Sequence, residues 1–189
     1  LSIRRQRQMC IRDRGYLPWM RLERHNLDQA VATAIDTLAA YLNTVFQADG
    51  ATRHDLRAQA YARLSDLRIA LQRGLSEPRL VSRRALAWWP VEVALERVAN
   101  AISDTAWSLP ADQTPPTPAE LAQLAGALHA MAEAVAQGAP VAVDVIDAPV
   151  PALHEAAAAI ESLRATLAGP EFATTPGKPA PSSSNVHQL

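Results

Sequence analysis

The chain has 189 residues and carries 18 basic and 19 acidic side chains, a formal net charge of -1 at pH 7. This balance excludes a globally basic protein that binds nucleic acid along its phosphate backbone. The apolar fraction of 49% consists largely of alanine, with 38 Ala against 2 Phe and 3 Tyr, and alanine has the strongest intrinsic helix preference. The composition therefore predicts closely packed helices. The single cysteine, Cys10, excludes an intrachain disulfide and a thiolate metal cluster.

The first 14 residues, LSIRRQRQMCIRDR, contain five Arg and show neither helical nor strand periodicity. They lack the apolar centre and the small-residue cleavage site of a secretory signal, and the run QRQMCIRDR resembles translated adapter sequence at the end of a gene model. We interpret residues 1–14 as non-native sequence. A basic arm for anionic lipid or nucleic acid is the alternative.

Two helices are predicted next. The first covers residues 21–47, where apolar residues recur every three or four positions, and Asp49-Gly50 should end it. The second covers residues 53–76. It should end before Pro78, because the residue that precedes a proline is disfavoured in the helical region.

The third predicted helix covers residues 80–108 and contains a proline in its middle. Pro90 should either start a new helix at Trp89 or kink a continuous one, since it lacks the N–H that a helix interior requires. Residues 15–110 are thus predicted to form a three-helix core segment.

A proline-rich connector leads into the second half. Residues 111–118 hold three prolines in eight positions and are typical of an exposed connector. Thr117, Pro118 and Glu120 have the arrangement of a helix start, with an N-cap, a proline at the first helical position and the glutamate of a capping box. Gly138 is the predicted C-cap of this fourth helix.

The remaining chain completes the predicted fold. Residues 139–149 are the only β-like stretch, and we expect an extended loop because one strand cannot form a sheet alone. A fifth helix fits residues 151–168, so residues 119–168 should form a helical hairpin. Residues 169–189 are rich in Pro, Ser and Gly and are predicted to be a disordered tail. The predicted fold class is all-α, an antiparallel bundle of four to five helices.

Motifs for catalysis or cofactor binding are sparse. The sequence has no dinucleotide fingerprint, phosphate loop or nucleophile elbow, and no Glu-x-x-His of a di-iron bundle. His129 and Glu133 would share a helix face, and His154 and Glu155 could approach from the next helix, which leaves a helical metal-dependent enzyme as a weak alternative. Glu92 and Glu96, one turn apart, are expected on a solvated charged face rather than as glycosidase carboxylates. We therefore expect no enzymatic activity, no cofactor and no metal.

Arginines and tryptophans indicate interaction surfaces. The charge is uneven, because residues 1–97 hold 16 Arg against 10 acids (+6) whereas residues 98–189 hold 1 Arg and 1 Lys against 9 acids (-7). Eight arginines should line the polar side of the second and third helices, partly paired with neighbouring acids, and a role against anionic lipid headgroups is the alternative. They are Arg53, Arg57, Arg63, Arg68, Arg73, Arg79, Arg83 and Arg84.

The adjacent residues Trp88 and Trp89 point about 100° apart on a helix and cannot both face one narrow core stripe. The one left over should pack at a bundle corner beside Pro90, or anchor a contact with another domain, a membrane or a partner subunit.

Three segments carry a resemblance to a known family. They are RLERHNLDQAVATAIDTLAAYLN (21–43), RAQAYARLSDLRIALQRGLSEP (57–78) and AWWPVEVALERV (87–98). Together they resemble the fusaric acid resistance (FUSC) family of bacterial inner-membrane proteins. The resemblance covers about residues 17–168 and is strongest over residues 53–98.

The resemblance implies two membrane-helix bundles, each followed by a helical region on the cytoplasmic side, and efflux of aromatic carboxylic acids. This chain would be the C-terminal region, cut off after the last span. Three observations fit: position 1 is not methionine, the longest uncharged runs have 12 residues where a span needs about 18–20, and Arg21, Arg24 and His25 form a basic N-terminal edge. The resemblance carries over no catalytic residue.

We therefore expect a domain with a structural, regulatory or oligomerising role on the cytoplasmic face of the inner membrane. Its expected partners are the transmembrane part of the same protein, a second copy of the chain and anionic lipid headgroups, but not nucleic acid. The alternative function is a free-standing helical adaptor that dimerises through its alanine-rich helices. The candidate residues are Arg73, Glu77 and Pro78 for the turn between the second and third helices, and Trp88, Trp89 and Arg97 for a contact surface.

Overall fold

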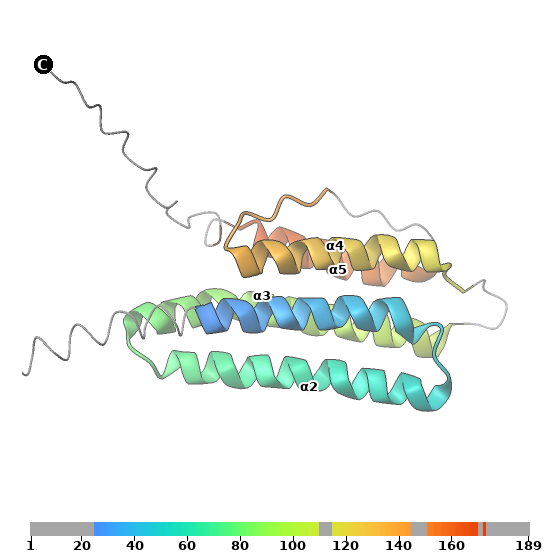
Figure 1. The fold of residues 1–189 in the computed structure, drawn as a ribbon, viewed down its shortest axis with the longest axis horizontal. Helices are drawn as coiled ribbons and strands as arrows, with labels where there is room; N and C mark the ends of the chain where they lie inside the picture. Colours follow the sequence, from blue (N-terminus) through green and yellow to red (C-terminus); the bar gives the residue numbers. More distant parts are fainter. Residues whose placement is uncertain (1–24, 110–114, 145–150, 170–171, 173–189) are drawn as a thin grey trace, which may run out of the picture.

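The computed structural model describes residues 25–109, 115–144, 151–169 and 172. Within these ranges all regular structure is helical and there is no strand, so the predicted all-α bundle is confirmed (Figure 1). The N-terminal helix is described over residues 25–45. It is followed by α2 (Gly50–Leu75), α3 (Arg79–Ser108), α4 (Pro118–Gln137), the short 3₁₀ helix η1 (Pro151–Leu153) and α5 (His154–Leu167).

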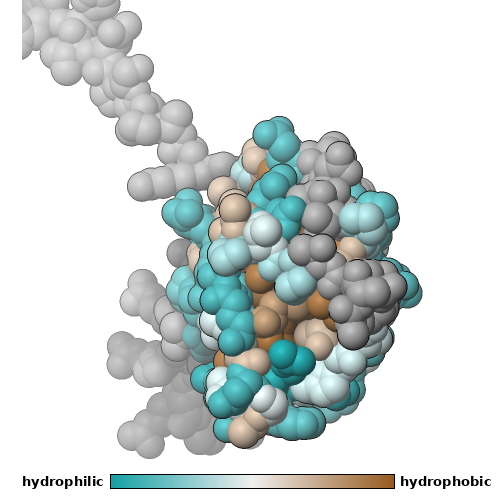
Figure 2. Space-filling view, turned by 90° about the vertical axis from the view of Figure 1, so that its right-hand side faces the viewer, coloured by the Kyte–Doolittle hydropathy of each residue, from teal (hydrophilic) through white to brown (hydrophobic). Residues whose placement is uncertain are grey.

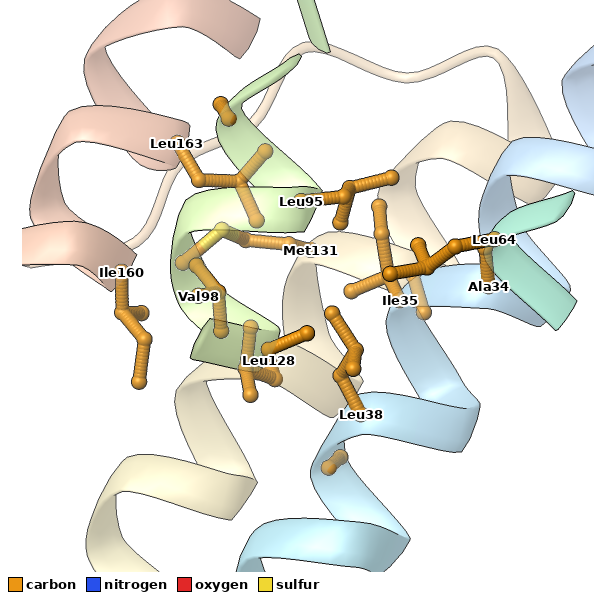
Figure 3. Close-up of a cluster of buried hydrophobic side chains, with 14 of the residues drawn as sticks. Ala34, Ile35, Leu38, Leu64, Leu95, Val98, Leu128, Met131, Ile160 and Leu163 are labelled. Carbon is orange, nitrogen blue, oxygen red and sulfur yellow. The ribbon is translucent and has the colours of Figure 1, made fainter. Parts of the chain in front are cut away.

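The helices form three layers. Figure 1 shows α2 along one side, the N-terminal helix and α3 in the middle, and α4 with α5 on the other side. Helix α3 packs against both α2 and α5 and so joins the two outer layers. The buried side chains form one hydrophobic core, and Figure 3 shows residues of all five long helices pointing toward one another within it.

A buried hydrogen bond joins the two middle helices. The Tyr41 hydroxyl lies 3.0 Å from the Ser103 Oγ, and Ser103 donates to the carbonyl of Ala99 at 2.8 Å. A serine hydroxyl has one proton, so Tyr41 must be the donor of the bond between the two helices. Burial raises the pKa of the Tyr41 hydroxyl above its ordinary value.

Helix α2 begins earlier than the sequence predicted. Asp49, expected to end the first helix, instead caps the second, because its carboxylate accepts the N–H of Thr52 at 2.8 Å. The predicted start at residue 53 is therefore three residues late.

Helix α4 has the ends that the sequence predicted. Thr117 and Glu120 form the capping box, and Pro118 stands at the first helical position. Gly138 ends the helix with φ of 64°, a left-handed conformation that residues with a Cβ disfavour.

Helix α3 is continuous from Arg79 to Ser108, so a new helix at Trp89 is the wrong one of the two outcomes predicted for Pro90. The proline cannot donate to the carbonyl of Leu86. Both residues are exposed, so water can take the place of the missing donor.

The structure describes parts of the other predicted segments. Residues 139–144 are an extended loop, and η1 and α5 occupy the predicted fifth helix. Residues 1–14, which we interpret from the sequence as non-native, lie outside the described residues, as does most of the predicted tail. No helix within the described ranges combines the length and apolar character that a bilayer-spanning helix needs.

Candidate functional site

The turn between α2 and α3 contains the three residues predicted to fix it. The N–H groups of Ser76 and Glu77 donate to the carbonyls of Arg73 and Gly74 at 3.1 and 3.2 Å. Pro78 then caps α3 and accepts the N–H of Val81 through its carbonyl at 2.9 Å. Arg73 serves the turn through its backbone, and its side chain is exposed.

Trp88 lies inside the bundle. It is 2% exposed, and its Nε1 donates to Oδ1 of Asp28 on the N-terminal helix at 2.8 Å. The Nε of Arg84 donates to the same oxygen at 2.9 Å, and its guanidinium lies 4.7 Å over the Trp88 ring. Of the three residues predicted as a contact surface, only Trp89, half-buried, and Arg97, exposed, contribute to the surface.

A small cavity lies beside Trp88. Its volume is about 110 Å³, and it is bounded by the loop after α4, the end of α5 and the ring of Phe172. The Phe172 ring is 4.5 Å from that of Trp88. Sites for drug-sized ligands have volumes of roughly 300–1,000 Å³, so this cavity is too small for such a ligand.

An ion-pair cluster ties α2 to α3. Glu92 is 2% exposed and accepts the Nε of Arg68 at 2.8 Å, while Glu96 pairs with the same guanidinium. The hydrogen bond to Glu92 raises the pKa of Arg68 above its ordinary value. The expectation that both glutamates lie on a solvated face is therefore wrong for Glu92. The carboxylate of Glu92 can be buried because Arg68 of the facing helix pairs with it.

A second arginine, Arg53, joins the same two helices at the end that lies away from the α2–α3 turn. Arg53 donates to the carbonyl of Ala106 at 3.1 Å and to that of Ala48 at 3.2 Å, so it holds the last turn of α3 against the start of α2. Arg53 and Arg57 also lie over the ring of Trp107, at 5.7 and 5.3 Å. Figure 2 looks at this end of the bundle, where apolar residues are visible inside a rim of hydrophilic ones. Sequence reasoning missed these contacts of Arg53.

The histidines do not assemble the metal site considered from the sequence. The Nδ1 of His129 lies 2.5 Å from Oδ1 of Asp36 on the N-terminal helix, and Glu133 accepts the side-chain amide of Gln137 at 2.9 Å. His154 begins α5. The described part of the chain contains no group of three side chains that could hold a metal ion.

Exposed hydrophobic side chains are concentrated on one hairpin. Among the described residues, all the large ones lie on α2 or α3, whereas the N-terminal helix, α4 and α5 have none. They are Ile69 (51% exposed), Leu75 (40%), Leu86 (63%), Val93 (37%) and Trp107 (38%). The α2–α3 hairpin is therefore the candidate interaction surface.

Comparison of the chain with protein-family models, with curated proteins and with solved structures finds no match. No relative therefore assigns a role to any of these residues.

Proposed function

We propose that the chain is the C-terminal helical domain of a FUSC-like membrane transporter, with a structural and oligomerising role on the cytoplasmic face of the bacterial inner membrane. One observation carries the proposal: the large hydrophobic side chains exposed in the described part all lie on α2 and α3. These two helices also carry the strongest part of the resemblance. Efflux of aromatic carboxylic acids would belong to the transmembrane part of the protein.

The ion-pair cluster holds α2 against α3. We call the exposed residues Ile69 and Val93, beside this cluster, the outer face of the hairpin. Arg68 joins Glu92, and the next residue on each helix, Ile69 and Val93, is exposed. The two apolar side chains therefore lie next to the ion pair, one on each helix. We propose that this outer face packs against the same face of a second copy, as in a two-fold symmetric interface.

Two measurements test the proposal. The gene sequence upstream of this region should encode apolar spans of about 20 residues. In the complete protein, a photo-crosslinking amino acid at Ile69 or Val93 should give a covalent dimer in membranes. Ala130 on α4 and Ala158 on α5 are exposed and serve as matched control positions.

The two measurements refute different parts of the proposal. An upstream start codon without spans would contradict the membrane protein and favour the free-standing adaptor that dimerises. Equal crosslinking from Ala130 and Ile69, or none from Ile69 and Val93, would contradict the oligomerising face.

A further inference from the structure

The structure divides the eight arginines between positions 53 and 84 into two sets. Five are engaged with backbone carbonyls, aromatic rings or carboxylates: Arg53, Arg57, Arg63, Arg68 and Arg84. The other three, Arg73, Arg79 and Arg83, have exposed side chains, and none forms an ion pair with another described residue.

The three remaining arginines all lie at one end of the bundle, around the α2–α3 turn. Two exposed leucines lie there as well, beside a close contact between α2 and α3: a Cβ at Gly74 would be 3.0 Å from the Cβ of Ala85. Leu75 and Leu86 are the next residues on the two helices. We call this set the hairpin tip; it consists of Arg73, Leu75, Arg79, Arg83 and Leu86.

The hairpin tip lies at the end of the bundle where the described chain begins. The same Cβ at Gly74 would lie 3.4 Å from a methyl carbon of Leu27, and Asp28 bonds to Arg84. A membrane span preceding the N-terminal helix would therefore place the bilayer on the side of the hairpin tip.

We propose that the hairpin tip binds the surface of a bilayer that contains anionic phospholipid. The arginines would contact lipid phosphates, while Leu75 and Leu86, 40% and 63% exposed, would enter the boundary between headgroups and acyl chains. The only acidic residue in the turn is Glu77, which is half-buried. The inference deepens the proposed function and rests on it for the position of the membrane.

The composition of the hairpin tip favours lipid over other partners. A nucleic-acid backbone offers phosphates but no apolar layer for two leucines. A stable protein interface uses about 20–30 residues on each side, which is far more than the end of one hairpin provides. A bilayer offers both chemistries over a surface that one end of a bundle can contact.

Sedimentation with phospholipid vesicles tests the inference on the purified 189-residue chain. We expect the chain to bind vesicles of phosphatidylglycerol and phosphatidylcholine, to bind vesicles of phosphatidylcholine alone much more weakly, and to dissociate as salt is added. Each arginine near an anionic surface strengthens binding by about fivefold, so the double variant Arg79→Glu, Arg83→Glu should weaken binding by about 25-fold or more. Leu86→Ser should weaken it by several-fold.

The double variant Arg63→Glu, Arg97→Glu is the matched control, since it changes the same net charge on exposed positions of the same two helices. It should weaken binding much less than the change at the hairpin tip. Equal losses in the two double variants would overturn the inference, as would binding that disappears only when residues 1–14 are deleted. Binding to duplex DNA without binding to anionic vesicles would also overturn it. These results do not depend on the upstream gene sequence, so the proposed function can fail separately.

Discussion

Removing Arg68 should destabilise the fold more than removing its buried partner. Arg68→Ala takes away the guanidinium that bonds to Glu92 and leaves a carboxylate that is 2% exposed. Glu92→Ala removes the buried charge itself. The Arg68 side chain is 44% exposed, so it can turn to water and can keep Glu96 as its partner.

The magnitude follows from the burial of Glu92. Breaking a buried ion pair by removing one partner costs about 3–5 kcal/mol, because an uncompensated charge stays inside. The truncated side chain would open a path for water to Glu92, so we expect a loss at or somewhat below the lower end of this range, about 2–3 kcal/mol. The Glu92→Ala variant should lose less than half as much. Glu96→Ala, which removes a 37% exposed carboxylate, should lose less than about 1 kcal/mol.

Chemical denaturation followed by circular dichroism measures these three free energies of unfolding. Equal and small losses in Arg68→Ala and Glu92→Ala at neutral pH would refute the reasoning, because they would mean that Glu92 behaves as a solvated surface charge.

Two further predictions concern single hydrogen bonds. Tyr41→Phe removes the donor to Ser103 and should lower the free energy of unfolding by about 1 kcal/mol in the same denaturation assay; an unchanged value would contradict the buried bond. The Thr52 N–H lowers the pKa of Asp49, so this cap stabilises the fold above the unfolded-state pKa and is lost as the pH falls through the folded-state pKa. The unfolding temperature of Asp49→Ala should lie below that of the unchanged protein at neutral pH, and this difference should narrow in acid. Asp49→Asn keeps a cap without a charge, so the difference between its unfolding temperature and that of Asp49→Ala should not change over the pH range in which Asp49 titrates.

The sequence was most informative where local physics decides the structure. Thr117, Pro118, Glu120 and Gly138 act through neighbours within a few residues, so their pattern alone predicted both ends of α4. The spacing of apolar residues predicted four to five helices, because it too depends only on residues three or four positions apart. Asp49 shows the limit of such reasoning, since an acidic residue before a glycine is suited both to end one helix and to cap the next.

Contacts between helices were beyond the sequence. Glu92 stands beside Val91 and Leu95 in the stripe that faces the core, but only the register of α2 against α3 brings Arg68 to it. The same holds for Asp28 on the N-terminal helix, whose carboxylate accepts a hydrogen bond from the indole N–H of Trp88 on α3. A single sequence indicates which face of each helix is apolar but not how neighbouring helices are aligned. It therefore could not predict which of the two tryptophans would find a hydrogen-bond acceptor for its indole N–H inside the bundle.

The arginine ion pairs of the described structure form within each half of the chain. Every arginine of residues 25–97 that forms an ion pair within the described structure pairs with a carboxylate of that same half, and Arg164 pairs with Glu161 inside the acidic half. The two halves are therefore joined mainly through the apolar core rather than by arginine pairs. Residues 25–97 hold nine Arg against eight acids, so most of the basic excess of the first half lies in residues 1–24, outside the described structure, and the hairpin tip is basic because three exposed arginines gather at one end. Such an asymmetric charge can orient a molecule toward an anionic surface before contact, in a salt-dependent manner.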